Sequence, residues 1–306
     1  MKNQNRTSQT YLKPNQNIWS FLEELKTKQI WKTKEGTVFC LFIGKTTERK
    51  YITEWECDVE LFDLGAIGEI GIKTSSDKPV FIRFGSLLKG EGTQSRMISA
   101  SIMLPARYHG RLPSIVRCVH ASHPVREGKM FRLRSIAPSR LAMKDTQSEV
   151  WSSVRHLTCE WKCISDDLSR DDLIRNMEIM EKDTKFKEFI KNFPCLEGQC
   201  GIFALKQNEW FIELFDHPES WKAFHEKLAF DVWDFFEYAK ERNVKGLNFE
   251  SNALGEELVR FLKQSEKQLR VRTDAGETFS LKGILFNHKT EGEITVSGNK
   301  AIHLFL

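Results

Sequence analysis

Short apolar runs separated by tight turns fill the first 85 residues, and no other feature constrains the fold as strongly. Residues 37–43, 67–72 and 79–84 each have the length and the apolar content of a strand. The turn signal at 74–79 leaves no room for a crossover helix between the second and third runs. Acidic and apolar residues alternate at 54–59, which favours another strand. The pattern predicts an antiparallel sheet or sandwich.

Three further strands are expected at 97–104, 114–120 and 130–136, where apolar residues recur with a period of two. Helical spacing begins near Asp145, which has the position of an N-cap because Glu149 follows in the first turn. Shorter or later elements are expected as follows: helices at 18–25, 165–193, 220–240 and 256–267, a hairpin at 201–215, and strands at 277–286 and 300–306 with a polar turn between them. The aromatic stripe of the 220–240 helix is expected to lie in the core.

These elements predict an α+β fold. Its N-terminal half (37–140) is expected to be antiparallel and β-rich, and its helix-rich, mixed half (145–306) ends in β-strands. Residues 18–306 are expected to form one large intertwined domain, preceded by a flexible polar arm at 1–17. Because the final strand ends at the last residue, we expect it to be paired within a sheet.

The composition excludes several protein classes. A formal charge of only +4 means that any basic surface must be local. No apolar run reaches the roughly 18 residues of a membrane span, and the polar N-terminus lacks the apolar stretch of a signal peptide. Seven cysteines, an odd number, favour a reducing cytoplasm over a disulfide scaffold. The pairs Cys159/Cys163 and Cys195/Cys200 lack zinc-knuckle spacing, so free thiols are favoured over a metal, and no cofactor is expected.

Positive charge is concentrated in residues 105–144, where seven arginines and two lysines stand against Glu127 alone. The arginines are 107, 111, 117, 126, 132, 134 and 140. Guanidinium groups bind phosphate or carboxylate bidentately and stack on planar rings. The segment therefore predicts a site for an anionic, planar ligand, with Arg117 among its contacts. The same charges also suit the phosphate backbone of a nucleic acid.

An amide is paired with a larger side chain on each flank of this segment. Gln94 and Arg96 follow a glycine-rich turn whose backbone amides can hold phosphate, although Gly90 is followed by Glu91, unlike a P-loop. Gln147 and Trp151 lie one helical turn apart, so that an indole can stack on adenine while an amide binds its edge. The alternative is structural: a braced loop and a core tryptophan.

Four residues are candidates for chemistry or for contact with a ligand. Cys118 and His120 share one face of a strand, which allows a thiol–imidazole pair, but a cysteine inside a strand is usually core. An enzyme would need His120 or Glu149 as its base. His303, near the C-terminus, is either a structural hydrogen-bonding residue or a ligand contact.

The order of several of these motifs resembles a known family. They are Gly85, Gly90, Gln94 and Arg96, then the strand at 113–119 with Cys118, then Gln147 with Trp151, and finally the ending at 283–305 with His303. Together they resemble the ADP-ribosylglycohydrolase- and rhodanese-phosphatase-associated protein domain family, over roughly residues 18–306. The family usually continues with Glu after the Cys-Val pair, whereas this chain has His120 there.

The resemblance implies an α+β domain in a gene neighbourhood with ADP-ribose or NAD-derived chemistry, often within bacterial antiviral or nucleotide-repair modules. Three functions stay open on this basis. The first is an accessory protein that binds or senses an ADP-ribose- or NAD-type nucleotide in nucleotide metabolism or phage defence. The second is a hydrolase or transferase acting on ADP-ribose linkages in the same pocket. The third is an adaptor that binds a protein encoded nearby, or less favourably a nucleic acid, through residues 105–144. No membrane partner is expected.

Overall fold

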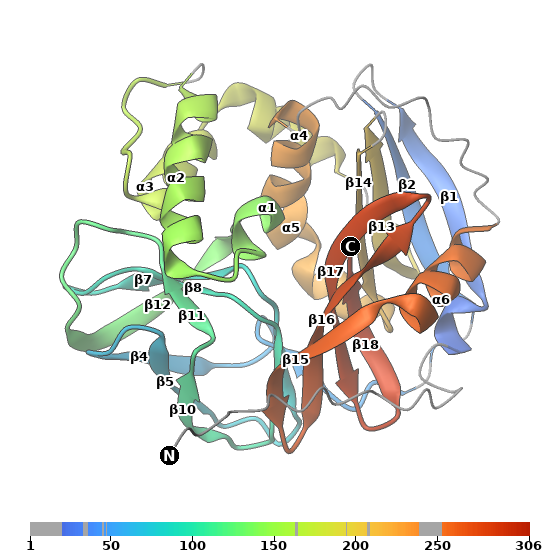
Figure 1. Cartoon of the computed structure of the whole chain (residues 1–306), viewed down its shortest axis with the longest axis horizontal. Helices are drawn as coiled ribbons and strands as arrows, with labels where there is room; N and C mark the ends of the chain where they lie inside the picture. The colour runs from blue at the N-terminus through green and yellow to red at the C-terminus, as the bar shows by residue number, and fades with distance from the viewer. Residues whose placement is uncertain are drawn as a thin grey trace, which may run out of the picture.

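The computed structural model describes residues 20–32, 36–44, 46, 48–162, 165–193, 195–206, 209–238 and 253–306. The expected arm at 1–17, Cys163 and the tip of the 201–215 hairpin lie outside these residues. Within them the chain forms six α-helices and three β-sheets, so the expected mixture of helices and mainly antiparallel strands is confirmed. Figure 1 shows the two larger sheets on either side of helix α5 (Pro218–Tyr238).

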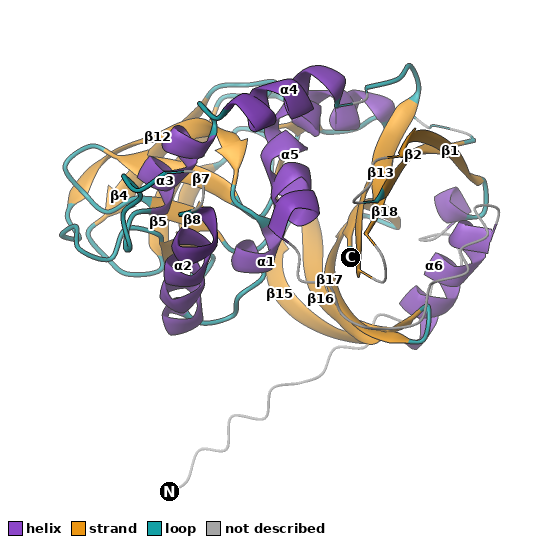
Figure 2. Cartoon of the chain, turned by 90° about the horizontal axis from the view of Figure 1, so that it is seen from above, coloured by secondary structure: helices purple, strands orange, loops and turns teal. Residues whose placement is uncertain are grey.

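An antiparallel sheet of eight strands combines the beginning of the described chain with its end. Its order is β1 (Leu25–Lys32), β2 (Thr37–Ile43), β13 (Gln199–Lys206), β14 (Glu209–Phe215), β18 (Lys300–Phe305), β17 (His288–Ser297), β16 (Gly276–Leu285) and β15 (Glu266–Thr273). The last strand lies inside the sheet, between β14 and β17, as expected from its position in the sequence. The sheet curves around α6 (Leu254–Gln264), whose buried Leu258 and Phe261 pack against it (Figure 2).

A second antiparallel sheet of seven strands carries four of the seven arginines of the arginine-rich segment, at 111, 117, 132 and 134. Its order is β10 (His109–Pro113), β5 (Glu69–Thr74), β4 (Val59–Leu64), β12 (Glu127–Ile136), β7 (Ser86–Gly90), β8 (Arg96–Ile98) and β11 (Val116–Cys118). A small sheet of β3 (Ile52–Thr53), β6 (Val80–Ile82) and β9 (Ile102–Leu104) shares a hydrophobic core with it. The β3–β6 pair is parallel, which corrects the expectation of antiparallel pairing throughout the N-terminal half.

Helix α5 packs between the two large sheets, where it contacts β12 of one and β13 and β14 of the other. The aromatic stripe of α5 is buried there: Trp221 and Phe224 are 0% exposed and Trp233 is 1% exposed, which confirms the expected core role. The other helices are α1 (Ser139–Ala142), α2 (Gln147–Trp161), α3 (Leu173–Met180) and α4 (Thr184–Asn192), with a 3-10 turn at Ser20–Leu22. Buried residues of α2, α3, α4 and α5 belong to one hydrophobic cluster.

The expectation of one strand at 97–104 is wrong. The segment forms β8 and β9, which belong to different sheets. Between them, the backbone N–H of Ser99 donates to the Ile115 carbonyl at 2.7 Å, and that of Ser101 donates to the Glu293 carboxylate at 3.1 Å. These long-range hydrogen bonds turn the chain from one sheet to the other, although the local pattern is continuously apolar.

The C-terminal expectations also need correction. Residues 288–297, expected to be a polar turn, form β17, and the expected helix at 256–267 ends at Gln264 before β15 begins. Charged residues are compatible with these strands where their positions face solvent: the exposed Lys282 of β16 pairs with the exposed Glu291 of β17 at 3.3 Å. The C-terminal half is therefore richer in strands than the sequence indicates.

Two expected helix starts differ in the structure. The N-cap of α2 is Thr146, not Asp145: the Thr146 side chain accepts from the Glu149 backbone N–H, and the Glu149 carboxylate accepts from the Thr146 backbone N–H. This reciprocal capping box satisfies two N–H groups at once, so it places the cap one residue later. At the N-terminus, the described part of the helix expected at 18–25 is only the 3-10 turn, and β1 begins at Leu25.

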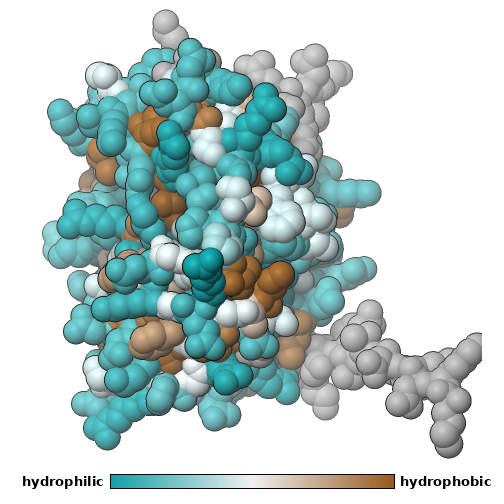
Figure 3. Space-filling model, turned by 90° about the vertical axis from the view of Figure 1, so that its left-hand side faces the viewer, coloured by the Kyte–Doolittle hydropathy of each residue, from teal (hydrophilic) through white to brown (hydrophobic). Residues whose placement is uncertain are grey.

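The surface offers little apolar area on the side shown in Figure 3, where apolar residues form small separate groups among hydrophilic ones. Among the described residues, none of the helices has both the length and the apolar composition that a membrane span requires.

Candidate functional site

Most of the candidate residues lie on or beside three adjacent elements: β8, its sheet partner β11, and the first turns of α2, which packs on β11. They are Gln94, Arg96, Cys118, His120, Gln147 and Trp151. The structure thus brings together the residues that the motif order singled out. The hydrogen bonds of each side chain show whether it is available to a ligand or already bound within the protein.

The Arg96 side chain is buried in the interior. It is 0% exposed, and its Nε and Nη2 donate to Oδ2 of Asp63 on β4 at 3.2 and 3.0 Å. Its Nη1 also contacts the Cys118 sulfur. Burial raises the pKa of the Cys118 thiol, and the nearby Arg96 only opposes that shift. A thiol that stays protonated is a weak nucleophile, so this environment supports a structural role for Cys118.

Gln147 fixes the edge strand β11 to helix α2. Its Oε1 accepts from the Cys118 backbone N–H at 2.8 Å, and its Nε2 donates to the Cys118 carbonyl at 2.8 Å. The amide side chain thereby replaces the neighbouring strand that an edge position lacks. Because side chains alternate along a strand, fixing the backbone at Cys118 also fixes the direction of Arg117 on the opposite side.

We expect Gln147→Ala to lower the free energy of unfolding by about 1–3 kcal/mol, because it leaves two buried backbone groups of Cys118 without their partner. Urea denaturation measures the effect. The matched control is Ser148→Ala, the exposed neighbouring position in the same helical turn. Equal stability of the two variants would show that the bridge between Gln147 and Cys118 contributes nothing measurable.

The remaining candidates have different surroundings. Gln94 is 6% exposed, and its Oε1 has no hydrogen-bond partner among the described residues, like the buried Nε1 of Trp151. Nδ1 of His120 lies 3.7 Å from Asp172, and its ring lies 5.1 Å from that of His123. Glu149 belongs to the capping box of α2. Roles of these residues in binding or catalysis stay predictions.

His303 lies away from this group, inside the protein. It is 0% exposed, and its Nε2 lies 2.7 Å from Oε1 of the equally buried Glu213. Its ring packs among Phe81, Phe84 and Phe215. These contacts match the structural alternative for this residue, and His303 does not line the cavity described below.

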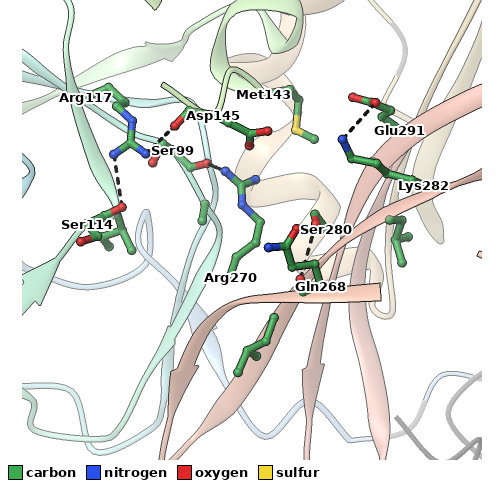
Figure 4. Close-up of a pocket in the computed structure, with 15 residues that line it drawn as sticks. Ser99, Ser114, Arg117, Met143, Asp145, Gln268, Arg270, Ser280, Lys282 and Glu291 are labelled. Atoms are coloured by element: carbon green, nitrogen blue, oxygen red, sulfur yellow. Dashed lines mark hydrogen bonds and ion pairs between the residues drawn. The ribbon is translucent and has the colours of Figure 1, made fainter. Parts of the chain in front are cut away.

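Arg117 points instead into a cavity of about 370 Å³ (Figure 4). One side of the cavity is formed by residues around β11 and by the segment that joins α1 to α2; the other side is formed by β15, β16 and β17. Its polar and charged lining residues are Ser99, Ser114, Arg117, Asp145, Gln268, Arg270, Ser280, Lys282 and Glu291. The lining includes no histidine or cysteine; it does include serines, Lys282 and the carboxylates of Asp145 and Glu291.

The guanidinium of Arg117 is oriented by carbonyl groups and not by a carboxylate. It donates to the carbonyl oxygens of Ser114, Val116 and Asp145 at 3.2, 3.1 and 2.8 Å. No ion pair of Arg117 occurs among the described residues, and its buried Nε has no partner there. The guanidinium is therefore held in place without a direct ion pair, with the Asp145 carboxylate nearby.

A second guanidinium, that of Arg270, lies near that of Arg117. Arg270 donates to Glu293 at 3.0 Å and also to the Ser99 carbonyl, which leaves it facing the same cavity. Burial, and then the nearby charge of Arg270, hold the pKa of Arg117 below its ordinary value. Two arginines that repel each other in a half-buried site favour an anion between them.

The other arginines of the 105–144 segment do not line this cavity. Strands β10 and β11 are opposite edges of the seven-stranded sheet, which separates Arg111 from Arg117. Arg140 is bound by Asp234 at 2.6 Å and also by Glu160. The segment that appears uniformly basic in the sequence thus divides into separate environments.

A comparison with protein families now complements this geometry. The model of the ARG and Rhodanese-Phosphatase-superfamily-associated Protein domain matches residues 22–306. The chain belongs to this family. The expected membership is confirmed, and the match spans both sides of the cavity. No curated protein and no solved structure matches the chain.

In this member of the ARG- and rhodanese-phosphatase-associated family, sequence reasoning did not find Arg270. A signal was present: Gln268, Arg270 and Arg272 alternate with Leu269 and Val271, as in a half-exposed strand. Assigning a helix up to residue 267 obscured it. Among the described residues, no group of three or more histidines, cysteines or carboxylates is placed to hold a metal ion.

Proposed function

We propose that the protein is a non-catalytic accessory that binds an ADP-ribose-type nucleotide, with the diphosphate in the cavity lined by Arg117 and Arg270. The main observation in support is that Arg117 is held by hydrogen bonds to three carbonyl groups, yet makes no ion pair with a carboxylate among the described residues. A planar guanidinium of this kind binds two phosphate oxygens at once.

The rest of the cavity supports this ligand class. Its volume of about 370 Å³ lies in the range of small-molecule sites, roughly 300–1,000 Å³. The side chains of Ser99, Ser114, Ser280 and Gln268 offer donors and acceptors suited to ribose hydroxyls. The family name records an association with ARG and rhodanese-phosphatase proteins. With the resemblance to proteins linked to ADP-ribosylglycohydrolases, this makes ADP-ribose the first ligand to test.

Binding is favoured over catalysis because the residues expected to act as nucleophile or base do not line the cavity. Neither the buried Cys118 nor the capping residue Glu149 lines the cavity, and no histidine does. In the proposed role, the protein works in the cytoplasm beside an enzyme from the same gene neighbourhood, in nucleotide metabolism or phage defence. Turnover of ADP-ribose by the purified protein would favour the hydrolase or transferase alternative.

Arg117→Ala is expected to weaken ADP-ribose binding by about 10- to 100-fold, which corresponds to the loss of roughly 1.5–3 kcal/mol from a charged hydrogen-bonding group. Isothermal titration calorimetry measures this. The matched control is Arg111→Ala, an exposed arginine at the opposite edge of the same sheet, which should bind like the wild type. The proposal is overturned if the wild type binds no ADP-ribose, or if Arg117→Ala binds it unchanged.

A further inference from the structure

The backbone of Ser114, beside the candidate site, has a conformation that a serine seldom adopts. Its φ is 63°, which lies in the left-handed region. A Cβ atom destabilises this region, so that glycine, asparagine and aspartate occupy it most often. Ser114 lies in the link between the end of β10 at Pro113 and the start of β11 at Val116, and it is exposed. Burial of its side chain therefore does not explain the conformation.

Three other residues with a side chain have a positive φ in the described part of the chain: Arg107, Phe286 and Asn287. Phe286 and Asn287 form the two-residue turn of the hairpin between β16 and β17, and tight hairpin turns require this conformation. Arg107 lies in the loop between β9 and β10. None of the three lines the cavity of Arg117, whereas Ser114 does. The left-handed conformation at Ser114 thus coincides with the candidate site.

The φ and ψ of Ser114 set the angle between the two peptide groups that flank it. The chain before Ser114 is held in place, because Pro113 of β10 pairs with Glu69 of β5. The peptide group after it carries the Ser114 carbonyl, which accepts from Nη1 of Arg117 at 3.2 Å (Figure 4). With β10 fixed, a change of Ser114 to the ordinary extended conformation would rotate this carbonyl away from Arg117.

The Ser114 carbonyl is one of three groups that orient the guanidinium. The Val116 carbonyl accepts from the same Nη1 at 3.1 Å, and the Asp145 carbonyl accepts from Nη2 at 2.8 Å. Without the Ser114 carbonyl, Nη1 keeps a single acceptor, and the plane of the guanidinium is less constrained. Because the N–H groups of a guanidinium are fixed in that plane, its orientation decides how it meets the oxygens of an anion.

We infer that Ser114 is a positioning residue: its left-handed backbone directs its carbonyl to Arg117 and so sets the orientation in which the guanidinium binds an anion. The inference rests on the proposed function for the identity of the ligand. It assigns the role to the backbone conformation of Ser114 and not to its hydroxyl group. Substitutions that change these two properties separately can therefore test it.

Two substitutions with opposite properties are compared by calorimetric titration of the full chain with ADP-ribose. Ser114→Thr keeps the hydroxyl, but its branched Cβ disfavours the left-handed conformation. It is expected to weaken binding about fivefold, as if about one molecule in five kept the conformation that orients Arg117. Ser114→Gly removes the hydroxyl, but glycine adopts a positive φ readily, so its affinity should stay within about twofold of the wild type.

The matched control is Asn287→Thr. It places the same side chain at another left-handed position, with a φ of 64°, in an exposed turn that does not line the cavity. We expect this variant to have a lower melting temperature, as Ser114→Thr should, but to bind ADP-ribose like the wild type. If Ser114 served stability alone, Ser114→Thr would behave like this control.

Wild-type affinity of Ser114→Thr would overturn the inference, as would binding by Ser114→Gly that is as weak as that by Ser114→Thr. Either result leaves the proposed function standing, provided that the wild type binds ADP-ribose through Arg117. If the wild type does not bind ADP-ribose, the proposed function fails, and inorganic pyrophosphate becomes the probe. Pyrophosphate binding that is weakened by Arg117→Ala and Ser114→Thr, but not by Ser114→Gly, supports the inference. Any other result with pyrophosphate, including no binding, refutes it.

Discussion

Glu213→Gln is expected to lower the free energy of unfolding by roughly 3–5 kcal/mol, the usual cost of removing one partner of a buried ion pair. Glu213 accepts from Nε and Nη2 of Arg83 at 2.6 and 2.7 Å, and from His303 at 2.7 Å, and all three side chains are 0% exposed. Burial raises the pKa of Glu213, but Arg83 and His303 outweigh it and lower the pKa below its ordinary value.

The location of this pair explains why the loss is large. Arg83 follows β6 of the small sheet, whereas Glu213 and His303 lie on β14 and β18 inside the eight-stranded sheet. The guanidinium also lies 4.0 Å from the centre of the Phe84 ring. Without the Glu213 charge, Arg83 keeps only the more distant Asp231 carboxylate, at 3.6 Å, as an ionic partner among the described residues. A buried cation would then be left poorly compensated.

Urea denaturation at neutral pH measures this loss. Glu219→Gln makes the same substitution at an exposed site in the first turn of α5 and should change stability by less than about 1 kcal/mol. The double variant Arg83→Met with Glu213→Leu should be more stable than Glu213→Gln, because it removes both buried charges. A loss below about 1 kcal/mol for Glu213→Gln would contradict the prediction.

Asp231 is expected to make the protein less stable as pH rises from about 4 to 7. Burial raises the pKa of its carboxyl to about 7, against the opposing effects of Arg83 and Ser139. In the unfolded chain the group loses its proton near its ordinary value of 3.8, whereas the folded protein retains it until about pH 7. The stabilising contribution is thus complete below pH 3.8 and is lost as pH rises through 7.

The expected loss of unfolding free energy follows from the raised pKa of Asp231. A difference of roughly three pKa units, at about 1.4 kcal/mol each, corresponds to about 4 kcal/mol. The measurement is the difference in unfolding free energy between wild type and Asp231→Asn, taken by urea denaturation at pH 4.5 and pH 8. Asn keeps the shape and the bond to the Ser139 backbone N–H. Asp77→Asn, at an exposed position, is the control. A wild-type-minus-variant difference that does not change with pH would refute the assignment.

Residue spacing by itself was sufficient for several elements. A short apolar run predicted β2, the period of two predicted β12, and helical spacing predicted α2 and α5. These patterns depend on neighbours along the chain and on which side chains share a face. The order of Gln94, Arg96, Cys118 and Gln147 indicated the family that the comparison then confirmed. The sequence did not predict what these residues do. The Gln147 side chain, for example, is hydrogen-bonded to the Cys118 backbone, although it was expected to contact a ligand.

The sequence by itself therefore determined the local elements and the family, and it indicated that positive charge is important near Arg117. Only the tertiary structure decided that Arg117 meets Arg270, because β15 and β11 belong to different sheets and approach each other through packing that no local pattern records. It likewise decided that Arg83, Glu213 and His303 form one buried group. The physical reason is the same for the Arg117–Arg270 site and for the buried group. Secondary structure depends on neighbours along the chain, whereas a site depends on how distant apolar faces pack and on which charges that packing leaves without a partner.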